Sequence, residues 1–90
     1  MEFEWNPNKA ESNYRKHGVT FEEAATVFND LLSITFPDPD HSIAESRYVT
    51  IGISRFGQIL IVAHTDRGEK IRIISARKAT RQEKKFYERG

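Results

Sequence analysis

The sequence predicts an α+β fold, with a small antiparallel sheet and helices packed on it. Two segments, at 20–23 and 80–83, carry the Thr-x-x-Glu capping box that starts a helix. Between them, residues 47–76 alternate strand-like runs with glycine-containing turns, which is typical of consecutive antiparallel strands. A chain of 90 residues can build only one modest core, so we expect a single domain over residues 1–90.

The first segment is expected to form a short strand followed by a helix. "FEW" at 3–5 is strand-like, and the helix is predicted over about 7–17. Asn6 is suited to cap its N-terminus, Pro7 to occupy its first position, and Gly18 to end it. The apolar positions of this helix are weak, so we expect it to lie on the surface.

A second helix is predicted over 21–29, where Thr20 and Glu23 form a reciprocal capping box. "LLSITF" at 31–36 is strand-like. The following segment, 37–46, contains two prolines and polar residues, and it is expected to be a loop of about ten residues.

The rest of the chain predicts three consecutive antiparallel strands and a last helix. The strands are expected at 47–54, 58–65 and 70–76, separated by the turn sequences RFG and DRG. The helix is expected from about 81 to 89, after the second capping box. The order that we assign to the whole domain is β-α-α-β-β-β-α.

The turns also predict the register of these strands. With Gly57 left-handed in the first turn, Arg47 lies opposite Thr65. With residues 67–68 as the second turn, His64 lies opposite Ile71. This register places Arg47, Thr65 and Arg72 on one face and Tyr48, His64, Ser75 and Arg77 on the other. Aliphatic side chains occupy both faces, so we expect helices on both.

The charge of the chain is strongly polarised. Residues 1–66 carry five Lys/Arg and ten Asp/Glu, a net charge of −5, whereas residues 67–90 carry nine and three, a net charge of +6. Such an asymmetry fits a surface that attracts anions, and nucleic acid is the commonest partner of such a surface. It equally fits a well-solvated last helix.

Several classes of protein are disfavoured by the composition. No run approaches the roughly 18 apolar residues that cross a bilayer, and the N-terminus lacks the features of a secretory signal, so we expect a cytoplasmic protein without membrane contact. There is no cysteine, and the three histidines (His17, His41 and His64) lack the spacing of metal ligands. We therefore expect neither a metal site nor a cofactor.

Three stretches resemble one protein family: "FEWNPNKAESNYRKHGVTFEEAATVF", "ESRYVTIG" and "RIISARKATRQEKKFYE". From about residue 3 to residue 88, the chain is similar to the BrnT toxins of type II toxin–antitoxin systems. The residues that match the family pattern are Trp5, Asn6, Lys9, Asn13, Lys16, His17, Gly18, Val19, Phe21, Glu45, Arg47, Gly52, Thr65, Arg67, Ile73, Ser75, Ala76, Arg77 and Tyr87.

The resemblance implies a RelE-like fold and a ribonuclease activity that halts translation. It also implies neutralisation by a BrnA-like antitoxin with a ribbon-helix-helix part that binds DNA. The toxin itself would then contact RNA, and it would meet operator DNA only through the antitoxin.

RNA cleavage without a metal requires a base for the ribose 2′-hydroxyl, cations for the scissile phosphate and an acid for the leaving 5′ oxygen. Arginine suits the phosphate because its planar fork donates two hydrogen bonds and keeps its charge. The expected phosphate-binding arginines are Arg47, Arg72 and Arg77, which would converge on one pocket, with His64 or Glu45 transferring protons. The further residues expected to bind RNA are Lys16, Arg67, Lys78 and Arg81.

Each of these residues has a competing interpretation. The arginines can form surface ion pairs, and His64 can be a buried histidine bonded to Tyr48. His17 fits a helix-capping cation, and it is also a third candidate for the catalytic acid or base. For the whole protein, the alternative is a non-catalytic module whose basic C-terminal helix binds an acidic protein or nucleic acid.

Overall fold

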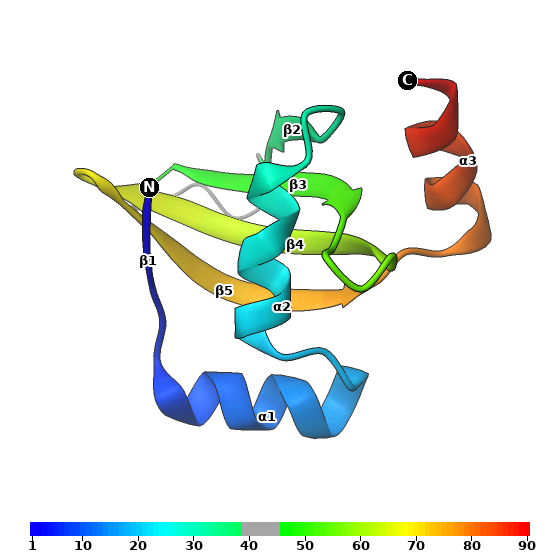
Figure 1. Ribbon diagram of the computed structural model, residues 1–90. Helices are drawn as coiled ribbons and strands as arrows, with labels where there is room; N and C mark the ends of the chain where they lie inside the picture. The colour runs from blue at the N-terminus through cyan, green and yellow to red at the C-terminus, as the bar shows by residue number, and fades with distance from the viewer. Residues whose placement is uncertain (39–45) are drawn as a thin grey trace.

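A five-stranded sheet forms the centre of the protein (Figure 1). The structure, a computed structural model, describes residues 1–38 and 46–90. Its elements are β1 (Glu2–Glu4), α1 (Pro7–His17), α2 (Phe21–Thr26), the 3-10 helix η1 (Val27–Asn29), β2 (Ile34–Pro37), β3 (Arg47–Ile53), β4 (Ile59–Arg67), β5 (Lys70–Lys78) and α3 (Arg81–Arg89). No helix among these residues is long and apolar enough to span a membrane.

The α+β class is confirmed, but the sheet is mixed and not antiparallel throughout. Its strands lie in the order β1-β5-β4-β3-β2, and β1 runs parallel to β5 while the other neighbours are antiparallel. About 65 residues separate β1 from β5, so no turn sequence signals their pairing. The strand expected at 31–36 is confirmed as β2, at the edge beside β3, so the order β-α-α-β-β-β-α assigned to the whole domain is one strand short.

The local signals for the helices act largely as predicted. Asn6 accepts hydrogen bonds from the backbone N–H of Asn8 and Lys9, and Gly18 ends α1 at a left-handed φ of 70°. The predicted 21–29 helix divides into α2 and η1. The loop expected at 37–46 lies mostly outside the described residues.

The capping box of α2 is only half formed. Thr20 Oγ1 accepts from the backbone N–H of Glu23, as predicted. The Glu23 carboxylate, however, is buried and does not return to Thr20. It accepts hydrogen bonds from Ser54 Oγ (2.7 Å) and Gln58 Nε2 (2.8 Å), and it thereby fastens α2 to the turn between β3 and β4.

The predicted register of β3 and β4 is confirmed. Arg47 lies opposite Thr65, and Gly57 has a φ of 82° in the connecting turn. Glycine populates this left-handed region without the steric cost that a Cβ brings, so the turn sequence determines the pairing.

The predicted register of β4 and β5 is wrong. The turn residues are 68–69, which moves the pairing by two residues, and a bulge lies between Ala63 and His64. His64 therefore lies opposite Ile73, and Arg77 lies opposite Ile61. Because a bulge changes the side on which the following residues point, Ser75 and Arg77 share the face of Arg47, Thr65 and Arg72.

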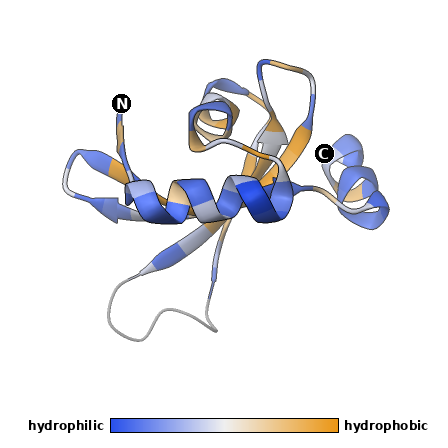
Figure 2. Cartoon of the chain, turned by 90° about the horizontal axis from the view of Figure 1, so that it is seen from below, coloured by the Kyte–Doolittle hydropathy of each residue, from blue (hydrophilic) through white to orange (hydrophobic). Residues whose placement is uncertain are grey.

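The core lies on the other face of the sheet, beneath α2. Phe21, Ala24 and Val27 pack there against residues of β4 and β5, among them Leu60, Val62 and Ile73. Gly52 allows η1 to approach β3, because a Cβ at this position would lie 2.7 Å from Val27 Cγ1. In Figure 2, α1 is mostly hydrophilic along the side facing the viewer, as expected for a surface helix.

Asn13 joins α1 to the edge of β5. Its Nδ2 donates to the carbonyls of Val19 (3.1 Å) and Ala76 (2.8 Å), and its Oδ1 accepts from the N–H of Ala76 (3.1 Å). The pairing between β1 and β5 ends at Glu4 and Arg72. The Asn13 amide thus takes the place of a neighbouring strand at Ala76, and it holds α1 at this edge.

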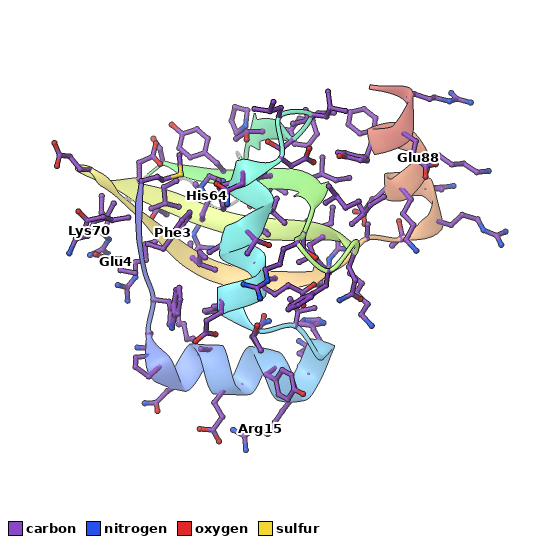
Figure 3. All side chains as sticks on the ribbon, in the orientation of Figure 1. Phe3, Glu4, Arg15, His64, Lys70 and Glu88 are labelled. Carbon is purple, nitrogen blue, oxygen red and sulfur yellow. The ribbon has the colours of Figure 1, made fainter. Side chains whose placement is uncertain are left out.

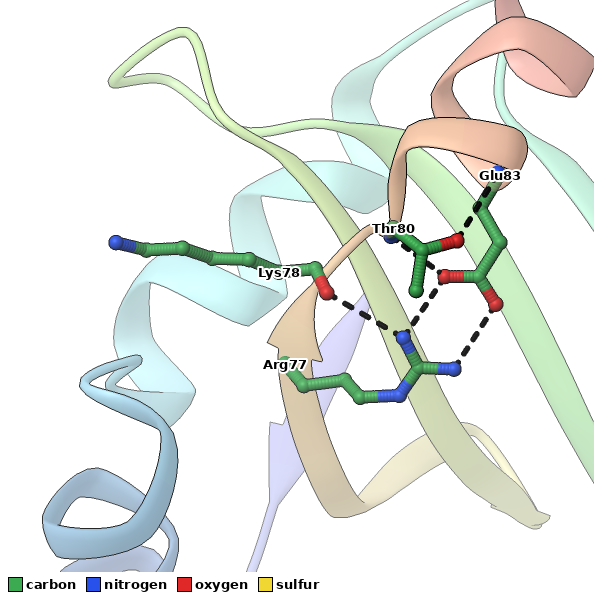
Figure 4. A network of polar contacts seen from close by, with 4 residues as sticks. All are labelled: Arg77, Lys78, Thr80 and Glu83. Carbon is green, nitrogen blue, oxygen red and sulfur yellow. Dashed lines mark hydrogen bonds and ion pairs between the residues drawn. The ribbon is translucent and has the colours of Figure 1, made fainter.

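Polar contacts hold α3, which has no buried residue. Arg77 donates from Nη1 and Nη2 to the two carboxylate oxygens of Glu83, at 2.8 and 2.9 Å, and Glu83 also accepts from the N–H of Thr80 (Figure 4). At the other end of the helix, the Tyr87 hydroxyl donates to Asp30 Oδ2. These contacts place α3 beside the sheet (Figure 1).

We predict that Asn13→Ala lowers the free energy of unfolding by about 2–4 kcal/mol, because three buried backbone groups lose their partner. Urea denaturation measures the change. Asn8→Ala, on the exposed side of the same helix, is the control and should change the free energy by less than about 0.5 kcal/mol. Equal effects of the two substitutions would contradict a structural role for the Asn13 amide.

We also predict a loss of stability in acid that depends on Glu83. The hydrogen bonds from Arg77 lower the pKa of Glu83 from its ordinary value of 4.5 to about 2. The contribution of a carboxylate with a lowered pKa is complete above pH 4.5 and is lost as the pH falls towards 2. Urea denaturation between pH 6 and pH 2 should show this loss in wild type and in Glu88→Gln, but not in Glu83→Gln.

Candidate functional site

The predicted phosphate-binding arginines do not converge on one pocket. Arg72 Nη1 lies 3.0 Å from Glu4 Oε2. Arg77, five residues after Arg72 in β5, is bonded instead to Glu83 of α3. Figure 3 shows Glu4 near the end of the sheet that is remote from α3. Arg47 is close in register only to Arg72, through Thr65 between them. The expectation of a single arginine pocket is therefore wrong.

His64 is buried, with an exposed fraction of 4%. Its Nε2 shares a hydrogen bond of 2.7 Å with Thr50 Oγ1, and its ring stacks on Tyr48 and meets the edge of Phe28. In Figure 3 it lies between the sheet and the α2–η1 segment. Burial lowers the pKa of His64 below 6.5, which favours a neutral ring. His64 is thus a buried histidine, but its hydrogen-bond partner is Thr50, and Tyr48 only stacks on its ring. The ring is not accessible to an RNA phosphate.

The other predicted site residues lie at separate places. Glu45 falls outside the described residues. Lys16 is exposed on α1, Arg67 is exposed at the turn between β4 and β5, and Lys78 and Arg81 are exposed on either side of the link to α3. Lys16 lines a cavity together with two other cationic or imidazole side chains, Lys9 and His17.

That cavity, of about 210 Å³, lies between α1 and β5. Lys9, Ser12 and Lys16 line it from positions i, i+3 and i+7 of α1, which share one face of a helix. The other lining residues are Asn13, His17, Ile74 and Ser75. We call this cavity the α1–β5 groove. The Asn13 clamp to Ala76 positions it, because the clamp holds the helix face against the strand.

The α1–β5 groove has the chemistry of an anion site. Its lining includes two ammonium groups and an imidazole, and no carboxylate. Neither Lys9 nor Lys16 forms an ion pair with the residues that the structure describes. His17 is half-buried at the C-terminal end of α1, and Ser75 contributes an exposed hydroxyl from β5. Cations and hydroxyl donors of this kind bind phosphate oxygens.

Sequence reasoning did not assign Lys9, Ser12 or Ser75 to a site. The spacing of Lys9, Ser12 and Lys16 was a usable signal, since it defines a polar helix face. No local sequence pattern indicates that Ser75 lies across from this helix face, because their proximity depends on the parallel β1–β5 pairing and on Asn13. Within the described residues, no group of three His, Cys, Asp or Glu could hold a metal ion.

Comparisons with known proteins agree on one family. Residues 5–83 match the family model described as the ribonuclease toxin BrnT of type II toxin–antitoxin systems. The chain is also similar to the crystal structure of the Brucella abortus ribonuclease toxin BrnT, with a TM-score of 0.71 and 27% identity over 90% of this chain and 99% of that one. No curated protein matches the chain. The chain therefore belongs to the BrnT family of ribonuclease toxins of type II toxin–antitoxin systems.

Proposed function

We propose that this protein is an endoribonuclease that cleaves RNA without a metal ion, and that the α1–β5 groove is its active site. Membership of the BrnT family supports the ribonuclease activity. The observation that carries the proposal is the gathering of Lys9, Lys16 and His17 opposite Ser75 in one accessible groove without a carboxylate. A polyanion meets two lysines there that form no ion pair with the described residues, whereas Arg72 and Arg77 are already bonded to carboxylates.

The groove can supply the parts of an attack by the ribose 2′-hydroxyl on the adjacent phosphate. His17 takes the 2′-hydroxyl proton as the new O–P bond forms. Lys9 and Lys16 stabilise the negative charge that builds on the phosphate oxygens, and the Ser75 hydroxyl donates to one of them. The bond to the 5′ oxygen breaks, and water or an ammonium group protonates that oxygen. The products are a 2′,3′-cyclic phosphate and a free 5′-hydroxyl.

Cations on either side of the groove would hold the rest of the RNA. Arg47 and Arg72 lie towards one end of β5, with Arg67 at the neighbouring turn, and Arg77, Lys78 and Arg81 lie towards the other end. For Arg72 and Arg77, an RNA phosphate would replace the carboxylate partner. His64 has a structural role in this proposal, because it is buried. A role for Glu45 stays a prediction.

The cellular part of the proposal follows from the family. A type II toxin–antitoxin system implies an antitoxin partner and an RNA substrate. We propose that RNA cleavage in the cytoplasm halts translation and that a BrnA-like antitoxin neutralises the toxin. The toxin would contact operator DNA only through that antitoxin. A RelE-like relationship of the fold also stays a prediction.

We predict that His17→Gln lowers the rate of RNA cleavage by about 10²–10⁴-fold, because it removes the proton acceptor. Lys16→Ala should lower the rate by about 10²–10³-fold, because it removes a charge that stabilises the transition state. Cleavage of a labelled RNA by purified protein measures both rates. Arg15→Ala is the matched control, since Arg15 is the adjacent cation and points away from the groove (Figure 3).

The Arg15→Ala variant should cleave at close to the wild-type rate. Wild-type rates in both His17→Gln and Lys16→Ala would refute the proposed site. If both variants still arrest growth, and only deletion of α3 abolishes the arrest, the protein acts as a non-catalytic binding module.

We further predict that cleavage continues at an unchanged rate in EDTA. The reaction proposed for the groove uses only side chains, so a chelator removes nothing that it needs. The measurement compares rates before and after dialysis against EDTA, with added Mg²⁺ as the second condition. A rate that falls in EDTA and returns with Mg²⁺ would show that the metal-free reaction is wrong.

A further inference from the structure

A second cavity, of about 330 Å³, lies between α3 and the sheet face opposite the core. Val49, Ile51 and Ile61 form its floor, and the contacting rings of Phe36 (β2) and Phe86 (α3) also line it. We call it the α3 groove. It shares no lining residue with the α1–β5 groove.

The α3 groove presents apolar surface to solvent. The rings of Phe36 and Phe86 contact each other, with their centroids 5.7 Å apart, and the two residues are 37% and 51% exposed. Helices were expected on both faces of the sheet, but α3 has no buried residue, so it covers this face only in part. An exposed apolar hollow with a polar rim is typical of a surface that binds another macromolecule.

The rim of the α3 groove is cationic. Lys78 and α3 together carry five Lys/Arg and two Glu, and Arg77 neutralises one of these, Glu83. Lys85 and Arg89 follow the groove residue Gln82 at i+3 and i+7, so they flank Phe86 on the same edge of the helix. A partner that fits must therefore combine apolar side chains with carboxylates.

RNA fits the α3 groove less well than a protein segment does. Phosphates would find the cationic rim, but the aliphatic floor offers no hydrogen-bond donor for a sugar or a base edge. An amphipathic acidic peptide matches both parts, because its apolar face fills the hollow while its carboxylates meet the rim.

We propose that the α3 groove binds an acidic amphipathic segment of the antitoxin. Apolar side chains of that segment pack against the Phe36–Phe86 ring pair and the aliphatic floor, and its carboxylates pair with Lys85 and Arg89. The inference rests on the proposed function for the existence of the antitoxin. The bound segment covers Arg77, one of the residues proposed to hold RNA beside the active site, so its binding competes with RNA binding.

The test measures binding of the purified antitoxin, identified as the protein whose co-expression restores growth, by titration calorimetry. Phe86→Ala should raise the dissociation constant at least tenfold, since a partly exposed ring at the centre of a contact is a typical anchor. Phe56→Ala, at a 65% exposed ring in the β3–β4 turn, is the matched control and should change it less than twofold.

Charge reversal tests the rim. Lys85→Glu should weaken binding more than Lys84→Glu does, since Lys84 lies on the flank of α3 away from Phe86. The difference should shrink in high salt because exposed charges are screened. Equal effects of the two reversals would overturn the pairing of the partner's carboxylates with this rim.

RNA cleavage separates this inference from the proposed function. Phe86→Ala should cleave RNA at the wild-type rate. If the wild type does not cleave RNA while Phe86→Ala still loses the antitoxin, the proposed function fails and the docking site stands. The inference is overturned if Phe86→Ala and Phe36→Ala both bind antitoxin like wild type. It is equally overturned if they lose RNA binding while keeping the antitoxin, which would make the groove a site for base stacking.

Discussion

The arrangement of this protein depends on the side-chain amide of Asn13. Strand β1 pairs with β5 for only three residues, which leaves the edge of β5 at Ala76 without a strand partner. The Asn13 amide donates to and accepts from the backbone of Ala76, as a neighbouring peptide group would. It also donates to the carbonyl of Val19, which follows α1. Because buried backbone groups need partners, this contact fixes both the rotation of α1 and its distance from the sheet. The groove next to it exists for that reason.

The positive charges of the chain divide into two kinds. Arg72 and Arg77 hold Glu4 and Glu83, and these pairs join β1 and α3 to β5. Lys9 and Lys16 make no such pair with the described residues, and the one acidic residue of their helix, Glu11, is paired with Arg15. A cation bonded to a carboxylate offers little attraction to a phosphate until that bond breaks, whereas an unpaired ammonium attracts it at once. This difference is why the lysines of α1 and not the arginines of β5 define the candidate site.

The two grooves lie on different sides of β5 and differ in their apolar surface. The α1–β5 groove combines cations with an imidazole, and the α3 groove combines an apolar floor with a cationic rim. Helix α3 is held by Glu83 at its start and by Tyr87 at its end, where the hydrogen bond to Asp30, with a smaller effect of burial, raises the pKa of Tyr87 to about 12. With both ends fixed, the helix can keep its exposed apolar face open beside the sheet. A single strand thus separates a surface suited to a polyanion from one suited to a protein.

The sequence by itself determined the features that depend on near neighbours in the chain. The caps at Asn6, Thr20 and Thr80, the glycine at the end of α1 and the turn at Gly57 all act within a few residues, so their patterns predicted three helices and the β3–β4 register. The family resemblance was confirmed as well. Only the tertiary structure decided the parallel β1–β5 pairing, the bulge that turns Arg77 to the other face, the burial of His64 and the approach of α1 to Ser75. These contacts join residues tens of positions apart, and their energies depend on packing and on buried backbone groups that no local pattern records.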